Sequence, residues 1–372
     1  MKRFLGAMLI VVLLLTGCGA GATTPAPMEE APAPTEESET VEIRTLRMMT
    51  HNSFNISEET IAAFEEAHGA KVEILESGDA GVMVNQAILS VANPLADVLY
   101  GVDNTLLSRA LNADIFEPYA SPLLDQIIDD LKLDPQHRAL PVDYGDVCLN
   151  YDRAWFEEAG IAPPENLEDL VAPDYKGLTV VQDAASSSPG LAFLLATVGR
   201  FGESGDYTYL DYWADLLEND VAIAGDWNEA YWGRFTHGSG GEGDRPIVVS
   251  YASSPPAGVY FAEEPMDEAS AAPTAAVVGD ESCFRQIEFV GVLKGAQNPD
   301  LARAWVDFML DVTFQEDIPL NMFMFPANEN ADLPEVFARY AVIPENPAEV
   351  PYEAIEANRE AWVAAWADVA LR

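Results

Sequence analysis

Basic side chains are scarce in this sequence. It holds 19 Lys and Arg residues against 62 Asp and Glu residues, which gives a formal net charge of −43 at pH 7. A field of this sign repels nucleic acid and anionic lipid surfaces, which excludes a DNA or RNA partner. The same field would attract a small cation, although an acidic, solvated surface alone also accounts for the excess charge.

Histidines and the short signatures of common enzymes are also few. None of the four histidines, His51, His68, His137 and His237, has the i, i+4 spacing of a helical zinc pair. The sequence contains no G-x-S-x-G, Walker A, H-E-x-x-H or C-x-x-C motif. We therefore expect no metal site, no cofactor and no enzyme activity.

Long apolar runs are absent except for a short one at the N-terminus. It extends from Leu5 to Leu15, follows Lys2 and Arg3, and is too short to span a bilayer comfortably. The run ends in L-T-G-C at 15–18, which is typical of a lipoprotein signal peptide cleaved before a lipid-modified cysteine. We predict that residues 1–18 are this signal peptide and lipobox. Lipid on Cys18 would then anchor an exported protein to the outer face of the cytoplasmic membrane, on the cell surface or the periplasmic side.

Cysteine is rare, with three residues in the chain. If Cys18 carries lipid, Cys148 and Cys283 remain. An exported location permits a disulfide between them. Two separate buried thiols are equally compatible with the sequence, because spacing alone does not determine pairing.

Residues 19–40 lack large apolar side chains and are rich in Pro, Glu, Ala and Thr. Proline stiffens such a segment and glutamates extend it by repulsion. We predict a disordered linker between the lipid and a folded part that begins near Val41. The folded part is long enough for two domains of ordinary size.

Strands and helices alternate in the first part of the folded region. Strands are predicted at 45–49, 71–75 and 96–100, and helices after Ser57 and at 82–91. This order predicts a mostly parallel sheet covered by helices. Ligands in such sheets bind at the carboxyl ends of the strands, where the loops 51–55, 78–81 and 101–104 lie.

A second alternating pattern follows Asp143. Strands are predicted at 179–182, 247–251 and 286–293, and helices at 191–198, 300–310 and 352–370. The loop after Gln182 leads into a helix N-terminus, which favours anionic groups. Residues 238–245 are predicted to form a surface loop.

Three kinds of side chain gather in the loops at these strand ends. Carboxylates would face a cation, serines supply small hydrogen-bonding groups, and aromatic rings offer flat faces. A planar cationic heterocycle would suit this set, although each residue alone has a structural alternative as a cap, a turn residue or a core side chain. The candidate ligand-binding residues are His51, Ser53, Asp79, Asp103, Asp143, Ser187, Ser188, Trp227, Tyr231, Tyr251, Ser253 and Phe323.

Seven short segments carry a family resemblance. They are T-H-N-S-F at 50–54, A-D-V-L-Y-G-V-D-N at 96–104, P-V-D-Y-G at 141–145, Q-D-A-A-S-S-S-P-G at 182–190, W-N-E-A-Y at 227–231, S-Y-A-S-S-P at 250–255 and F-M-F-P at 323–326. In this order, and with N-R-E-A-W at 358–362, the chain resembles the thiamine-binding periplasmic proteins of ABC importers over essentially its whole mature length.

The resemblance implies an α/β fold of the periplasmic-binding-protein type. It consists of two lobes, each a mostly parallel sheet flanked by helices, with crossover strands as the hinge. The first lobe would comprise residues 41–145 and 285–372, and the second residues 146–284.

The resemblance also implies roles for single residues. Asp79 matches an acidic residue that meets the thiamine end of the ligand, and Ser187 matches a position at the hydroxyethyl or phosphate end. Trp227 and Tyr251 match aromatic residues that wall the pocket. Where the family has a tyrosine, a tryptophan and another tyrosine, this chain has His51, Phe323 and Ala257. These replacements thin the aromatic wall.

The function that this resemblance implies is capture without chemistry. A lipid-anchored monomer would bind thiamine, or a phosphorylated or related thiamine compound, and deliver it to an ABC permease. Two alternatives stay open: a binder of another small cation such as a polyamine or ferric iron, and a lipid-anchored hydrolase. An iron site should show paired tyrosines, and Tyr251 is followed by Ala252.

Overall fold

The computed structural model of the protein describes residues 43–262 and 270–370. These residues belong to one compact unit that begins at Ile43. The predicted signal peptide 1–18 with Cys18 and the predicted linker 19–40 lie outside the described residues. None of the described helices combines the length and the apolar character needed to cross a membrane.

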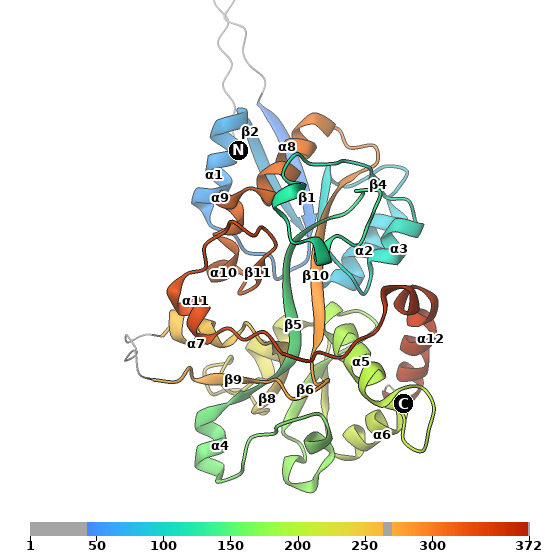
Figure 1. The fold of residues 1–372 in the computed structure, drawn as a ribbon, viewed down its shortest axis with the longest axis vertical. Coiled ribbons are helices and arrows are strands. Elements are labelled where there is room, and N and C mark those ends of the chain that lie inside the picture. The colour runs from blue at the N-terminus through green and yellow to red at the C-terminus, as the bar shows by residue number, and fades with distance from the viewer. Residues whose placement is uncertain (1–42, 263–269, 371–372) are drawn as a thin grey trace, which may run out of the picture. The chain divides into compact units, whose positions relative to one another are not determined.

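The described strands form one mixed sheet of eleven strands (Figure 1). Eight of them follow the order β2-β1-β3-β10-β5-β8-β6-β7, while β4 pairs with β10 and both β9 and β11 pair with β5. The strands are β1 Arg44–Thr50, β2 Ala70–Glu76, β3 Val98–Asp103, β4 Phe116–Glu117, β5 Leu140–Asp152, β6 Thr179–Gln182, β7 Ala222–Ala224, β8 Ile247–Tyr251, β9 Thr274–Val277, β10 Phe284–Leu293 and β11 Phe325–Pro326.

Strand pairing is parallel at the two ends of this order and antiparallel in the middle. β1 pairs in parallel with β2 and β3, and β6 with β7 and β8. β5 and β10 are antiparallel to each other and to their outer neighbours β8 and β3. Parallel strands flanked by helices are thus confirmed for both ends. Figure 1 shows β5 and β10 side by side, running from one end of the unit to the other.

Helices surround both ends of the sheet (Figure 1). The α-helices are α1 Glu58–His68, α2 Ala80–Leu89, α3 Leu107–Asn112, α4 Arg153–Ala159, α5 Ser188–Phe201, α6 Tyr209–Glu218, α7 Pro255–Tyr260, α8 Pro299–Leu310, α9 Val312–Gln315, α10 Ile318–Asn321, α11 Glu335–Tyr340 and α12 Tyr352–Ala370. Short 3-10 helices occupy η1 Leu124–Gln126, η2 Asp129–Leu131, η3 Glu168–Val171 and η4 Pro173–Tyr175, and η5 Glu229–Arg234 is a π-helix.

Local sequence explains where α1 begins and ends. The Ser57 side chain accepts a hydrogen bond from the Thr60 N–H, which satisfies one of the free donors of the first turn. Gly69 ends the helix at φ 57°, in the left-handed region that glycine adopts without steric cost. The predicted start of a helix after Ser57 is therefore confirmed. Asp79 caps α2 in the same way through the Ala80 N–H.

Several elements near the site were not predicted, and β5 and η5 are two of them. β5 is a single strand of 13 residues, whereas the sequence indicated a new pattern after Asp143. Almost all of its positions are buried, and the fully buried Asp143 and Asp146 interrupt the apolar run that would reveal such a strand. The π-helix η5 was also missed, since one wide helical turn has no distinct apolar period.

The C-terminal helix α12 packs on α6, beside the β6–β8 end of the sheet (Figure 1). Trp366 of α12 meets Trp213 of α6 edge to face, with ring centroids 5.6 Å apart, and both rings are fully buried. The predicted partition assigned 285–372 to the first lobe, and this helix instead packs with the other end. The lobe boundaries therefore stay a prediction, and the packing of α12 on α6 does not follow them.

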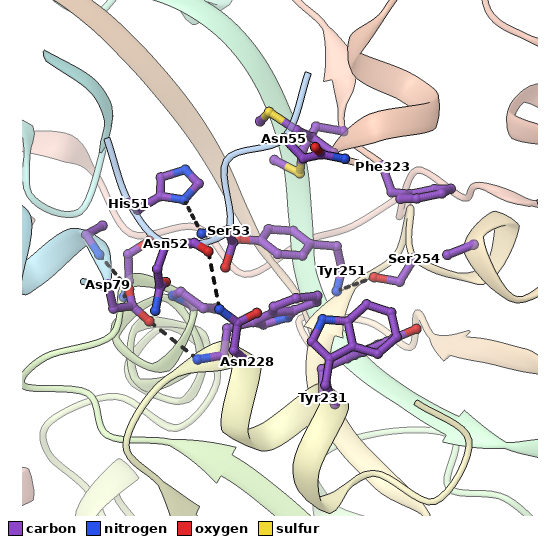
Figure 2. A pocket seen from close by; sticks show the side chains of 18 of the residues that line it. His51, Asn52, Ser53, Asn55, Asp79, Asn228, Tyr231, Tyr251, Ser254 and Phe323 are labelled. Carbon is purple, nitrogen blue, oxygen red and sulfur yellow. Dashed lines mark hydrogen bonds between the residues drawn. The ribbon is translucent and has the colours of Figure 1, made fainter. Parts of the chain in front are cut away.

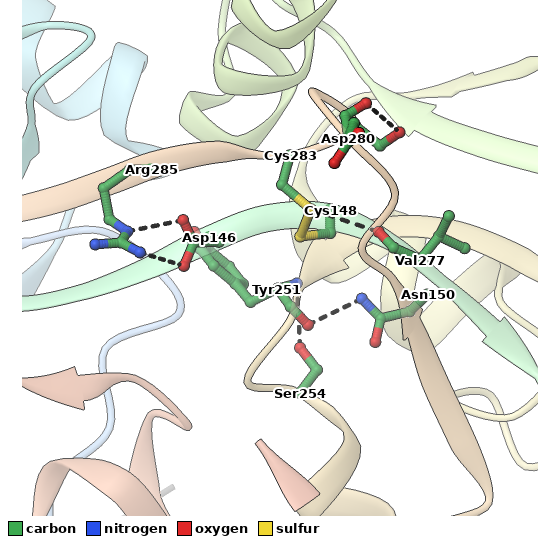
Figure 3. The surroundings of a disulfide bond; sticks show 10 residues. Asp146, Cys148, Asn150, Tyr251, Ser254, Val277, Asp280, Cys283 and Arg285 are labelled. Carbon is green, nitrogen blue, oxygen red and sulfur yellow. Dashed lines mark hydrogen bonds and ion pairs between the residues drawn. A yellow bond between two sulfur atoms is a disulfide. The ribbon is translucent and has the colours of Figure 1, made fainter. Parts of the chain in front are cut away.

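A disulfide joins the two middle strands. Cys148 lies on β5, and Cys283 immediately precedes β10, where Val147 is paired with Phe284. Next to it, the Arg285 guanidinium donates to both oxygens of the buried Asp146 carboxylate at 2.7 and 3.0 Å (Figure 3). Of the two arrangements left open by the sequence, the structure has the bridged one. These cross-links hold β5 and β10 in register below the cavity.

Candidate functional site

A cavity of about 270 Å³ is lined by residues from both parallel ends of the sheet. Its walls come from the loop after β1, the start of α2, the start of α5, the π-helix η5, the end of β8, α7 and the loop 321–324 (Figure 2). Predicted site residues that line it are His51, Ser53, Asp79, Ser188, Trp227, Tyr231, Tyr251 and Phe323. Eight residues predicted from separate parts of the sequence thus surround one space.

Stacked aromatic rings form one wall of the cavity. Trp227 and Tyr231 lie nearly parallel, with an interplanar angle of 15° and centroids 4.8 Å apart. Trp232 meets both rings edge-on and is half exposed. The Trp227 indole N–H donates to the Ser250 hydroxyl at 3.1 Å, which fixes the ring orientation. Trp227 and Tyr231 thus present a rigid flat surface.

A second aromatic group also lines the cavity and includes Phe323 and Phe261. Phe323 packs against Phe261 and Tyr260 with centroids 5.7 and 6.3 Å away. Its backbone has φ 56°, a conformation that a phenylalanine rarely adopts and that tends to occur at functional sites. Phe261 is 61% exposed, so this end of the cavity is apolar and open to solvent.

The Asp79 carboxylate connects three segments around the cavity. Oδ1 accepts from the Ala80 N–H at 2.7 Å and from the Ser188 N–H at 3.1 Å, and Oδ2 accepts from the Trp227 N–H at 3.4 Å. Burial raises the pKa of Asp79, and the nearby Ser187 hydroxyl and the hydrogen bonds from Ser188 and Ala80 oppose part of this rise. Asp79 therefore ties α2 to α5 and to the aromatic wall (Figure 2).

His51 and Glu288 form the polar floor of the cavity. The imidazole Nε2 lies 3.2 Å from Glu288 Oε1, and the Ser53 N–H donates to Nδ1 at 3.2 Å. A Cβ on Gly101 would lie 2.3 Å from the imidazole ring, so the glycine at φ 92° gives His51 its space. Burial lowers the pKa of His51, but the Glu288, Asp79 and Asp103 carboxylates outweigh it, and this pKa is raised.

Behind the floor, two carboxyl groups share a tyrosine. The Tyr100 hydroxyl contacts Asp143 Oδ2 closely and lies 3.1 Å from Glu288 Oε2. Burial and the Glu288 charge raise the pKa of Asp143 well above its ordinary value, whereas His51 helps to keep the pKa of Glu288 low despite burial. We expect Asp143 to hold a proton when Glu288 is ionised, because two adjacent buried carboxyl groups do not both ionise.

Some predicted site residues lie outside the cavity lining: Asp103, Asp143, Ser187 and Ser253. All are buried in neighbouring turns and strand ends. Asp103 closes the turn after β3, where Oδ1 accepts from the Thr105 N–H, the Thr105 hydroxyl and the Leu106 N–H. Burial raises the pKa of Asp103 to about 6. Asp103 therefore acts as a turn residue, which was the alternative to a role in ligand binding.

Other lining residues were not among those predicted: Asn52, Asn55, Ala80, Pro189, Asn228, Trp232, Phe261, Glu288, Asn321, Met322 and Met324. Glu288 had a usable signal, since it is a charged residue inside the apolar strand 286–293. Asn52 and Asn228 gave none, because asparagine in a loop ordinarily indicates a turn. In the structure the Asn228 amide donates to the Asn52 carbonyl at 3.3 Å.

Within the described ranges, no group of three or more His, Cys, Asp or Glu side chains is placed to hold a metal ion. The arrangement instead offers carboxylate charge on one side, flat rings on another and an apolar opening. Chemically, these features suit noncovalent binding of a flat molecule with a positive charge.

We expect His51 to titrate above its ordinary value of 6.5. Because the folded-state pKa is raised, pairing with Glu288 adds stability that is fully present below that value and is lost as pH rises through the folded pKa. Histidine NMR titration measures the pKa of His51. Glu288→Gln should lower this pKa, because it removes the carboxylate charge that raises it. His237, whose pKa burial lowers, is the internal control. A His51 pKa unaffected by Glu288→Gln would contradict the pairing.

Known proteins resemble this chain in sequence and in fold. Residues 93–342 match the family described as bacterial extracellular solute-binding protein. The thiamine-binding periplasmic protein of Salmonella typhimurium is 28% identical over 82% of this chain and 85% of its own length.

Solved structures give the same picture. A periplasmic thiamin binding protein aligns with a TM-score of 0.77 at 25% identity, covering 89% of this chain and 97% of that one. A ferric binding protein from Campylobacter jejuni shares the fold, with a TM-score of 0.69 at 19% identity over 87% of this chain and 99% of that one. The predicted periplasmic-binding-protein fold is confirmed, and the chain belongs to the bacterial extracellular solute-binding proteins.

Proposed function

We propose that this protein is the lipid-anchored, monomeric binding component of an ABC importer, and that it captures thiamine or a related thiamine compound without transforming it. The observation that carries the proposal is the cavity itself, in which the Asp79 and Glu288 carboxylates face the stacked rings of Trp227 and Tyr231. The relatives named thiamine-binding support the same ligand class.

The energetics require several contacts to act together. A cation held over an aromatic face gains about 0.5–2 kcal/mol, and micromolar affinity needs about 8 kcal/mol. The cavity supplies a preformed ring wall and carboxylates that burial keeps from water. Preformed groups lose little conformational freedom on binding, so more of their interaction energy remains as affinity.

Binding would couple to closure of the two ends of the molecule around the ligand. Asp79 and Asn52 lie at one end of the sheet, and their partners Ser188, Trp227 and Asp226 lie at the other. These hydrogen bonds exist only when the ends approach. A ligand that contacts both ends favours the closed state by its differential affinity for that state. The closed form would then be the one that delivers its cargo to the permease.

The lining distinguishes this ligand class from the alternatives. A polyamine would need carboxylates at both ends of the cavity, and the open end is formed by Phe261, Phe323 and Ala257. Ferric iron would need a cluster of anionic ligands, and none is found among the described residues. The similarity to the ferric binding protein supports the fold alone. A hydrolase would need a base beside a serine, and the one lining histidine, His51, is paired with Glu288.

Removing the aromatic wall tests the ligand. We expect Trp227→Ala to weaken thiamine binding by about 10-fold or more, because it removes one face of the wall. Trp227→Phe, which retains a flat ring, should lose less. Isothermal titration calorimetry measures both affinities, and circular dichroism checks that the variants fold. Thiamine affinity equal to the wild-type value in folded Trp227→Ala would count against this site.

Gly81 tests closure. A Cβ at this position would lie 2.4 Å from the Ser186 carbonyl oxygen, across the cavity edge between α2 and the loop before α5. In α2 itself alanine is favoured over glycine by about 1 kcal/mol. Gly81→Ala should therefore keep or raise the unfolding midpoint of the ligand-free protein while weakening thiamine binding about 10-fold.

The control for Gly81→Ala is Asn85→Ala in the same helix, which improves helix propensity away from Ser186 and should leave affinity unchanged. Calorimetry and thermal unfolding supply the two readings. Unchanged thiamine affinity in Gly81→Ala, or an equal loss of stability and affinity, would contradict its role in closure.

Cys18 tests the anchor. In cells supplied with an alkyne fatty acid, the wild-type protein should be labelled and fractionate with membranes, since two or more acyl chains hold a protein on a bilayer. Cys18→Ser should lose the label and the membrane association, whereas Thr23→Ser in the linker should keep both. Labelled, membrane-bound Cys18→Ser would overturn lipidation at this residue.

A further inference from the structure

Positive charge is missing from the cavity. None of the described residues that line it is a lysine or an arginine, whereas Asp79 and Glu288 contribute carboxylates. A phosphate group at neutral pH carries nearly two negative charges and is ordinarily bound through charge-assisted hydrogen bonds from arginine, lysine or free backbone N–H groups. Arginine and lysine are absent from the lining, which leaves backbone N–H groups and neutral amide and hydroxyl side chains as donors.

The two residues of α5 that line the cavity, Ser188 and Pro189, offer it no free backbone N–H. A helix N-terminus is a ready anion site, and the sequence suggested this one for an anionic end of the ligand. Here the Ser188 N–H donates to Asp79 Oδ1 at 3.1 Å and the Ser187 N–H donates to the Asp183 carbonyl at 2.9 Å. Pro189 has no N–H to offer. The anion bound at this helix is the protein's own carboxylate.

The serine side chains beside this helix are also engaged or enclosed. The Ser188 hydroxyl accepts from the Gln286 amide at 2.7 Å. The Ser187 side chain is buried and does not line the cavity. The position that the family resemblance assigned to a hydroxyethyl or phosphate end therefore offers buried, neutral hydroxyls and no positive charge, and the Ser187 Oγ has no hydrogen-bond partner among the described residues.

Charge outside the cavity acts in the same direction. The Asp226 carboxylate is not part of the lining, but it accepts a hydrogen bond from the amide of the lining residue Asn52 at 3.3 Å. The chain as a whole carries a formal charge of −43. An anionic group that leaned out of the open end would therefore still meet a negative field, whereas a neutral hydroxyl would not.

We infer that the site is selective for the unphosphorylated form of its ligand, and that Asp79 is a specificity-determining residue that excludes a phosphate by occupying the α5 N-terminus with its own negative charge. The inference rests on the proposed function, because it concerns which thiamine compound the same cavity accepts. Like charges placed together in a low-dielectric site disfavour the wrong partner strongly.

Calorimetric titration of the exported chain with thiamine, thiamine monophosphate and thiamine diphosphate tests the inference. We expect each phosphate to bind on the order of 100-fold more weakly than thiamine. Asp79→Asn retains an oxygen for the Ser188 N–H but removes the charge. It should reduce the ratio of thiamine affinity to the affinity for each phosphate about 10-fold. Asp174→Asn, an equal charge change at an exposed position, should leave the ratio unchanged.

The outcomes separate the two proposals. If thiamine and its phosphates bind within about threefold of one another, selectivity is overturned and the proposed function stands. If Asp79→Asn leaves the ratio at the wild-type value, the assignment to Asp79 is overturned. If only the phosphates bind, selectivity is overturned and the proposed capture of a thiamine compound stands; if no thiamine compound binds, the inference and the proposed function fall together.

Discussion

The Asp79 carboxylate is the interaction on which the site depends. It caps α2, accepts the Ser188 N–H at the start of α5 and accepts the Trp227 N–H beside the aromatic wall. Helix α2 lies at one end of the sheet, and Ser188 and Trp227 lie at the other. One buried carboxylate therefore links the two ends. Nothing covalent crosses this edge of the cavity, whereas β5 and β10 join the two ends behind it. The back of the cavity is therefore held by strands and a disulfide, and its front by hydrogen bonds alone.

Buried negative charge is the cost of this arrangement. Asp79, Asp103, Asp143 and Glu288 are all buried near the cavity, and His51 is the single titratable base in its lining. Burying unpaired charge is unfavourable, so part of it is removed by proton uptake at Asp143 and part is screened by hydrogen bonds to Asp79 and Asp103. A cation in the cavity would supply the missing positive charge. Ligand binding and charge compensation are then one event.

Local signals were enough to predict the elements that begin and end at capped helices or regular strands. Ser57 and Gly69 bounded α1, and the strands at 179–182 and 247–251 were predicted residue for residue. β5 was not, because its buried aspartates interrupt the apolar alternation that reveals a strand. For the same reason Asp143 was expected at the ligand rather than behind Glu288. Whether a strand-end carboxylate faces a cavity or closes a turn depends on neighbours that are distant in sequence, and Asp103 illustrates the second case.

The family resemblance predicted the fold and the ligand class, and the physical chemistry of the lining refines both. Under the proposed function, the stacked rings and the shielded carboxylates would together provide the affinity for a flat cation. Native mass spectrometry of protein purified from its host under gentle conditions tests this claim most directly. We predict one bound molecule per chain with the mass of thiamine, released when Trp227 is replaced by alanine. A retained ligand that is anionic or not planar would contradict it.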